Sequence, residues 1–443
     1  IKVYDDRYED LLDDPDIEGV IIALPLHLHA AASIKAMRKG KHVLCEKLMG
    51  HSVHECKEMA RVAAENNQIL AVGHQRHYSI LYDNAREMIR RGIIGDIHHI
   101  RAQWHRGNLP GRDSWQQQLP DDALRAEMDQ YATESEELLD RLTVSTNPSS
   151  WSSSLAARRA VAENKRKLAH LRLLDQRVDA EKYGYQSPKL SLPGGEVKTF
   201  SPHEELIRWR LWNRTGGGLM AELGSHQLDA ASIFISALRE DGEKVQPLSV
   251  CGNGGRHLFP PDRDAADHVY CNFEFPSPQY DRDRNKKIVV SYSSINGNGF
   301  GGYGEIVMGT NGTIVIERER EVELYQKDKP TTIQADKTAG PALDTTESGT
   351  YAAAETKAAS GPVSRGYTEE IEHWAWCIRN RDPANVPRCG PKVALADAVI
   401  ALVANQAIDT QCRIEFDPAW FDPQSDATPE AVAPNTQRPE YAS

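Results

Sequence analysis

The stretch between residues 19 and 73 constrains the fold most, because short apolar runs alternate in it with segments of helical spacing. The first run, Gly19–Pro25, is continuous and rich in β-branched residues, which is typical of a strand buried on both faces of a parallel sheet. Further segments of the two kinds follow at 26–38, 41–45, 53–66 and 69–73. Strands that alternate with helices predict an α/β fold with a doubly wound parallel sheet of the nucleotide-binding kind.

The residues before this first run lack the glycine-rich loop that usually opens such a sheet. A Gly-x-Gly-x-x-Gly loop would hold the phosphates of a dinucleotide, and an acidic or basic residue after the next strand would read its ribose. Neither feature precedes Gly19. We therefore expect the N-terminal part of the sheet to be missing from this sequence, as in a fragment. The alternative is a protein that has lost its dinucleotide site.

The later part of the chain predicts a second domain of another kind. Runs that alternate apolar and polar residues recur between residues 248 and 317 and predict a large, mainly antiparallel sheet. Charged helical segments at 121–142 and 154–183 predict a helical insertion, which would be a lid, an interface or a surface decoration. The expected divisions are a partial dinucleotide-binding domain over 1–100, an α+β domain over 101–422 with the insertion at about 112–205, and a poorly packed tail over 423–443.

Composition excludes several classes of function. The 443 residues carry a formal net charge of −12, which argues against nucleic acid as the main partner, because phosphate binding needs clustered Lys and Arg. The 7 cysteines have no regular spacing and are typical of reduced thiols. No continuous apolar run approaches the roughly 20 residues that span a bilayer, so no membrane partner is expected. Residues 327–366, low in apolar content, predict an extended loop.

The stretch Thr215–Asp229 carries the strongest chemical signal. Three glycines precede what reads as the opening of a helix, on which Glu222, His226 and Asp229 follow one another at spacings of four and three. This spacing places all three side chains on one helix face. A carboxylate beside an imidazole suits proton transfer, because the carboxylate orients the ring that takes the proton.

Two other interpretations of this stretch remain open. A Glu and a His four residues apart also occur as a solvated surface pair. The three side chains could bind a divalent metal, but the sequence shows no second cluster with ligand spacing, so no metal is expected. A second stretch, Gly40–Leu48, favours the catalytic interpretation. There an apolar run ends in adjacent Glu46 and Lys47.

Together the two stretches resemble the Gfo/Idh/MocA family of nicotinamide-dependent sugar oxidoreductases. The family motif Gly-Lys-His-Val-x-x-Glu-Lys-Pro is matched from Gly40, with Leu48 in place of Pro. Its motif Gly-Gly-Gly-x-x-x-Asp-x-Gly-x-His-x-x-Asp is matched up to Asp229, with Glu222 in place of the first Asp. The resemblance implies a Rossmann-like parallel sheet, followed by an α+β domain whose large sheet pairs subunits in a homo-oligomer.

The resemblance also implies roles for individual residues. His226 would be the catalytic base, Lys47 the ligand and proton partner of the substrate hydroxyl, and Glu222 the carboxylate that orients the histidine. Asp229 would bind substrate. The residues implied on the cofactor side, at the ends of the strands, are Leu24, Pro25, His29, Glu46, Lys47 and Gln75. Trp104 and Arg106 end a predicted strand at 97–105 and would line a sugar pocket, since aromatic faces stack on sugar rings.

The function implied is hydride transfer between NAD or NADP and a sugar, polyol or related cyclic alcohol. A glycosidase of the same family, which acts by transient oxidation and elimination, has the same residues and is a second interpretation. A sugar-binding or scaffold protein without the cofactor loop is a third. A glycine-rich loop upstream of Ile1 would favour the two enzymes over the binding protein.

Overall fold

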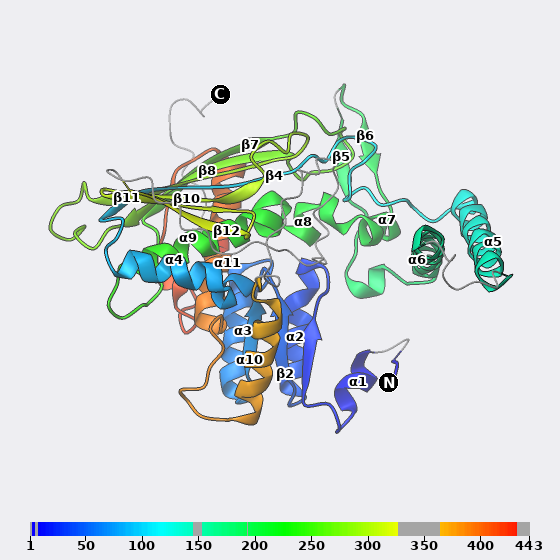
Figure 1. The fold of residues 1–443 in the computed structure, drawn as a ribbon, viewed down its shortest axis with the longest axis horizontal. Helices are drawn as coiled ribbons and strands as arrows, with labels where there is room; N and C mark the ends of the chain where they lie inside the picture. The colour runs from blue at the N-terminus through cyan, green and yellow to red at the C-terminus, as the bar shows by residue number, and fades with distance from the viewer. Residues whose placement is uncertain (1, 5–7, 145–152, 193, 327–363, 432–443) are drawn as a thin grey trace. The chain divides into compact units, whose positions relative to one another are not determined.

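The computed structural model describes residues 2–4, 8–144, 153–192, 194–326 and 364–431. Most of the predicted loop at 327–366 lies outside these residues. The chain divides into two compact units (Figure 1). The first unit comprises 1–112, 212–260 and 265–443, and the second comprises 113–211 and 261–264.

The first unit begins with the predicted parallel sheet. Its three strands, in the order β1-β2-β3, are β1 (Gly19–Ile22), β2 (His42–Glu46) and β3 (Leu70–Gly73). Helices α2 (His29–Arg38) and α3 (Val53–Glu65) connect them, preceded by the short α1 (Tyr8–Asp13). Ile22 pairs with Cys45, and Glu46 with Gly73, so the carboxyl ends of the strands form one edge. The predicted α/β class is confirmed, although β1 ends three residues before Pro25.

A second, larger sheet follows, with the order β12-β11-β10-β4-β9-β8-β7-β13. Neighbouring strands are antiparallel except β4 and β9, as the prediction of a mainly antiparallel sheet required. The strands are β4 (Ile97–His105), β7 (Ser249–Gly255), β8 (His268–Pro276), β9 (Lys287–Ile295), β10 (Tyr303–Gly309), β11 (Gly312–Glu317), β12 (Glu321–Gln326) and β13 (Ile414–Glu415). Strands β12 and β13 were not predicted, because each is short or strongly charged.

Two helices cover one face of this sheet and form its core: α9 (Ser225–Ser236) and α11 (Pro391–Thr410) (Figure 1). Helix α11 also packs on α3 and α9, so nearly all of its faces are buried. Among the described residues it is the helix whose length and composition would also suit a membrane span, and 61% of that apolar window is buried inside the protein. The sequence predicts a helix at 391–408, which is confirmed, and Lys392 and Asp397 keep it from being a continuous apolar run.

Two further helices, α4 (Ile80–Arg90) and α10 (Tyr367–Arg379), complete the first unit together with shorter turns. The predicted tail is better packed than expected as far as Ala431. The buried ammonium of Lys57, on α3, donates to the carbonyl oxygens of Ala419, Ser425 and Ala427. A buried cation needs such acceptors. These hydrogen bonds hold the chain segment that follows Phe421 against α3.

The second unit contains a helical hairpin, as predicted. Helices α5 (Asp122–Val144) and α6 (Ser153–Asp175) pack through a small apolar cluster that includes Leu124, Ala169 and Leu173. Helix α6 ends at Asp175 rather than near Tyr183, because the chain turns there and Tyr185 N–H bonds back to the carbonyl of Ala180. The remaining elements are α7 (Pro202–Ile207), β5 (Lys189–Ser191) and β6 (Val197–Thr199).

Candidate active site

Lys47 lies at the carboxyl end of β2 and reaches the turn before α9. Its ammonium donates a hydrogen bond to the carbonyl oxygen of Glu222 at 2.6 Å. Lys47 is partly buried. Two stretches 175 residues apart in the sequence therefore meet through one lysine.

The turn that carries Glu222 differs from the helix that its sequence predicts. Residues Met220–Gly224 form a π-helical turn, η6, and α9 begins only at Ser225. Glu222 thus lies in a π turn, and His226 in the α-helix that follows it. The predicted role of the Glu222 carboxylate stays a prediction, whereas His226 and Asp229 both lie on α9. The backbone oxygen of Glu222 accepts the hydrogen bond from Lys47.

The imidazole of His226 sits among aromatic and cationic side chains. Its ring centroid lies 5.5 Å from that of Trp104 and 6.3 Å from that of His74. Burial, together with the positive charges of Lys47 and Arg76, holds the pKa of His226 well below its ordinary value of 6.5. Nδ1 has no hydrogen-bond partner among the described residues, so the structure shows no carboxylate on that nitrogen. The ring is thus a neutral base at neutral pH.

Asp229 lies one turn further along α9 and is fully buried. His77 Nε2 is 2.8 Å from its Oδ1, and the ammonium of Lys244 is 3.2 Å from the same oxygen. Burial favours the neutral acid, but His77 and Lys244 outweigh it and hold the pKa of Asp229 well below its ordinary value. These partners hold Oδ1 of the carboxylate, and the predicted role of Asp229 in binding substrate stays a prediction.

Trp104 and Arg106 lie at the end of β4, as predicted, and both are buried. Trp104 stacks on Tyr303 of the neighbouring β10 with centroids 4.5 Å apart. The guanidinium carbon of Arg106 lies 5.8 Å from the Trp104 ring. One side of Trp104 thus belongs to a stack within the protein, and His226 lies against the ring as well.

The residues predicted on the cofactor side gather at the carboxyl edge of the parallel sheet. Leu24 is exposed and Pro25 partly exposed, just after β1. His29 is buried, and its ring nitrogens lie 2.8 Å from the carbonyl oxygens of Leu24 and Leu48. The imidazole therefore joins the segments that follow β1 and β2, which makes His29 a support of this edge.

Glu46 and Gln75 extend the same edge. The Glu46 carboxylate lies against Gly73, where a Cβ would come within 3.0 Å of Oε2. This close approach explains why a glycine ends β3. Gln75 is buried, and its Oε1 has no hydrogen-bond partner among the residues described. Such an unpaired acceptor in the interior is rare and is a natural contact for a bound donor.

Sequence analysis missed the ion cluster beneath these residues. Arg76, one residue after Gln75, donates Nε–H to Glu319 at 2.7 Å and Nη1–H to Glu305 at 3.2 Å. It also donates from Nη1 to the carbonyl oxygen of His226 at 2.6 Å. Burial raises the pKa of Glu305 to about 7 in spite of Arg76. Arg76 thus anchors the first turn of α9 to the large sheet.

Glu370 on α10 is a buried acid that gives a prediction of pH dependence. Burial raises the pKa of Glu370 to about 9, and the charges of Glu46 and Asp229 act in the same direction. The folded protein therefore keeps a proton that the unfolded chain loses above its ordinary pKa of 4.5. The stability that this proton contributes is present below pH 4.5 and is lost as the pH rises toward 9, at up to about 1.4 kcal/mol per pH unit.

We expect Glu370→Gln to stabilise the protein at pH 8 by about 1–3 kcal/mol, because an amide needs no proton to stay neutral. At pH 5 the variant and the wild type should differ little. Urea denaturation at both pH values measures the effect, with the exposed Glu372→Gln on the same helix as control. An equal change in the two variants would refute the explanation.

The fold and the site define a class of protein: a Rossmann-type sheet joined to an α+β domain, with a lysine at the end of the first sheet that bonds the turn before the histidine. The chain belongs to the Gfo/Idh/MocA family. The family's N-terminal model, described as an oxidoreductase family NAD-binding Rossmann fold, matches residues 1–74. The model of its C-terminal α/β domain matches residues 195–403, so the two together cover more than half of the chain.

Several characterised relatives match the chain over part of their length. A levoglucosan dehydrogenase from Pseudarthrobacter phenanthrenivorans is 34% identical over 97 residues, which are 22% of this chain and 25% of that protein. A 2,7-anhydro-N-acetylneuraminate hydratase from Mediterraneibacter gnavus is 32% identical over 105 residues, 24% of this chain and 26% of that protein. The matches thus span about a quarter of the length of these relatives.

Solved structures share the fold over nearly the whole chain. An inositol dehydrogenase homologue from Azotobacter vinelandii, in complex with NADH and myo-inositol, has a TM-score of 0.55 at 13% identity. The comparison covers 92% of this chain and 81% of that one. At this identity the likeness concerns the fold alone.

Proposed function

We propose that the protein is a dehydrogenase or reductase that transfers hydride between NAD or NADP and a hydroxyl-bearing carbon of a sugar, a polyol or a related cyclic alcohol. One observation carries the proposal: the ammonium of Lys47, at the carboxyl edge of the parallel sheet, touches the turn that leads into the neutral His226. In open α/β sheets ligands bind at this edge. A cation for the substrate oxygen and a base for its proton therefore stand beside the cofactor side of the sheet.

The substrate class is supported by the relatives. The names of the relatives refer to levoglucosan and an anhydro-neuraminate, both cyclic sugars, and a structural neighbour holds myo-inositol. Trp104 is 5% exposed and packs on Tyr303 and His226, so its predicted place in the wall of a sugar pocket stays a proposal. Pairing of subunits through the large sheet belongs to the same proposal and rests on family membership alone.

The residues divide the work of alcohol oxidation. Lys47 binds the substrate hydroxyl and favours its oxyanion character, and His226 accepts the hydroxyl proton at a ring nitrogen. The nicotinamide cofactor, when bound, takes up the hydride. Glu222, through its backbone oxygen, fixes the lysine in place. The predicted role of its carboxylate in orienting His226 stays a proposal, which Glu222→Gln would test through kcat/KM at unchanged stability.

The residues at the sheet edge suit a nicotinamide ring and its ribose. Leu24 and Pro25 present apolar surface, and the unpaired Oε1 of Gln75 offers an acceptor for an N–H or a ribose hydroxyl. Glu46 supplies a carboxylate on the neighbouring strand end. His29 takes part indirectly, since its ring already bonds the backbone of Leu24 and Leu48.

Lys47→Met tests the proposed substrate contact. Methionine keeps the length of the side chain but removes the cation, so we expect kcat/KM to fall by about 10²-fold or more with the fold intact. The protein with its natural N-terminal region is mixed with NAD or NADP and a panel of cyclic sugars and polyols, and reduced cofactor is followed by absorbance. The exposed Lys39→Met serves as control. Equal turnover in Lys47→Met and Lys39→Met would remove Lys47 from the mechanism.

The relative named as a hydratase favours a second candidate function. An enzyme that adds or removes water after a transient oxidation would use the same lysine and histidine but leave no net reduced cofactor. Mass analysis of the sugar products separates the two functions. Reduced cofactor that accumulates in proportion to an oxidised sugar indicates a dehydrogenase, and a dehydrated or hydrated sugar with unchanged cofactor indicates the second function.

A further inference from the structure

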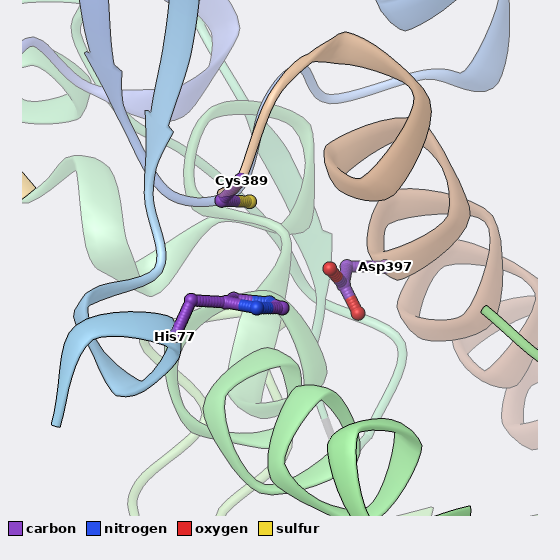
Figure 2. Close-up of side chains that lie close together, drawn as sticks. All are labelled: His77, Cys389 and Asp397. Atoms are coloured by element: carbon purple, nitrogen blue, oxygen red, sulfur yellow. The ribbon is translucent and has the colours of Figure 1, made fainter. Parts of the chain in front are cut away.

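The structure contains a second cluster of reactive side chains beside Asp229, which His77 contacts. One ring nitrogen of His77, Sγ of Cys389 and one carboxylate oxygen of Asp397 lie within 4.8 Å of one another. Figure 2 shows the three side chains converging from different parts of the chain: His77 from the turn after β3, Cys389 from the segment before α11, and Asp397 from α11 itself. We propose that this cluster is a zinc site.

The donor atoms are those that zinc prefers. Structural zinc sites combine thiolate, imidazole and carboxylate ligands in a tetrahedron, whereas Mg²⁺ and Ca²⁺ take oxygen ligands alone. Ligand atoms at zinc-bond distances lie about 3.5 Å apart, so the observed separations of up to 4.8 Å need only a small contraction. Cys389 and Asp397 are each only 1% exposed. A closed, buried site of this kind is structural rather than open to substrate.

A second observation points to a ligand at the same place. His74, Asp229 and Asp397 form another group of donor atoms within 4.8 Å, which shares Asp397 with the first. His74 is 1% exposed, its Nδ1 lies 3.6 Å from Oδ2 of Asp229, and neither ring nitrogen has a hydrogen-bond partner among the described residues. A buried imidazole without a hydrogen bond is costly unless something binds it. His74 or Asp229 is thus placed to supply the fourth ligand.

Lys244 binds only one oxygen of each buried carboxylate, so the other oxygen can bind the ion. Its ammonium contacts Oδ1 of Asp229 and Oδ1 of Asp397. The Oδ2 atoms of both carboxylates receive no hydrogen bond from the described residues. The lysine therefore occupies one side of the carboxylates and the zinc ion the other. Without zinc, Lys244 is the cation that keeps the two buried acids together.

The backbone holds the ligands in place before an ion enters. Val72 N–H, in β3, donates to the carbonyl oxygen of Cys389 at 3.0 Å. The neighbouring Arg388 donates from Nη1 to the carbonyl oxygen of His77 at 2.7 Å. Asp397 is fixed within the buried helix α11. A bound ion would thus link β3 and its following turn to the core helix of the large sheet.

Cobalt(II) is a suitable probe, because tetrahedral Co²⁺ with a thiolate ligand gives intense visible bands and a sulfur-to-metal charge-transfer band. We expect the chelator-treated wild-type protein to bind one equivalent of Co²⁺ with both signals, and Zn²⁺ to displace it and raise the Tm. Cys389→Ser should lose the charge-transfer band and bind more than about 100-fold more weakly. Cys251→Ser, which changes an exposed thiol, should behave as wild type.

X-ray absorption and the cobalt spectrum of the wild-type protein test the proposal even if the Cys389 variant does not fold. X-ray absorption of the zinc-loaded wild-type protein should show one sulfur at about 2.3 Å and nitrogen or oxygen ligands at about 2.0–2.2 Å. An ion bound through oxygen and nitrogen only, binding that depends on Cys251, or the absence of tetrahedral cobalt bands in the wild-type protein would each overturn it.

Discussion

His226→Ala is expected to lower kcat/KM for the sugar or polyol substrate by about 10²–10⁴-fold, the range that a well-placed general base contributes. The reason lies in the surroundings of the ring. Burial and the charges of Lys47 and Arg76 hold the pKa of His226 well below 6.5, so the imidazole is already neutral at pH 7 and can take a proton without first losing one. Initial rates with saturating cofactor at several substrate concentrations measure the effect.

The pH profile gives an independent check of the same assignment. Because the pKa of His226 lies well below 6.5, its protonation should not limit kcat/KM of the wild-type enzyme between pH 6.5 and 8. His98→Ala, which removes an exposed histidine of β4, should keep wild-type rates. If both variants retain the wild-type kcat/KM, the catalytic base is a residue other than His226.

Arg76→Met is expected to lower the free energy of unfolding by about 3–5 kcal/mol, because it leaves buried carboxylates without their cation. Arg76, Glu305 and Glu319 are each at most 4% exposed. Arg365 continues to pair with Glu319 at 2.7 Å, so Glu305 bears most of the loss. Urea denaturation followed by circular dichroism measures the change, with the exposed Arg101→Met of β4 as control.

A compensated variant separates lost charge pairing from lost packing. Replacing Arg76 by Met together with Glu305→Gln removes the carboxylate that loses its cation and keeps the pair of Arg365 and Glu319, and we expect it to recover much of the lost stability. A loss below about 1 kcal/mol in Arg76→Met alone would show that the buried pairs contribute little here. Arg76 also holds the first turn of α9 through the carbonyl oxygen of His226, so its replacement should lower activity as well.

The sequence predicted most where residues act locally. Apolar runs set the strands at 19–25, 41–45 and 69–73, and the structure confirms all three within a few residues. Lys47 and His226 were predicted because each lies in a motif of its own. Their spacing along the chain could not predict that Lys47 reaches the turn before His226. Strand β12 escaped prediction because Glu321 and Glu323 separate its few apolar residues, and β13 because its two residues are too few to show a pattern.

The buried ion pairs could not be predicted from the sequence, for a different reason. Asp397 in an apolar helix hinted at a buried partner, since lone carboxylates seldom enter a core. Its partner Lys244, however, lies 153 residues away, and only the packing of α11 near α9 brings them together. The same holds for Arg76 with Glu305, on strand β10 of the other sheet, and with Glu319, in the turn between β11 and β12.

By itself the sequence determined the class of fold and the residues able to move a proton, because apolar periodicity and motif spacing are properties of neighbours along the chain. Only the tertiary structure decided that Lys47 reaches the backbone of Glu222, that a π turn precedes α9, and which charges are buried around Arg76 and Asp229. The physical reason is that burial and charge pairing depend on distance in space, and they join segments that are far apart along the chain.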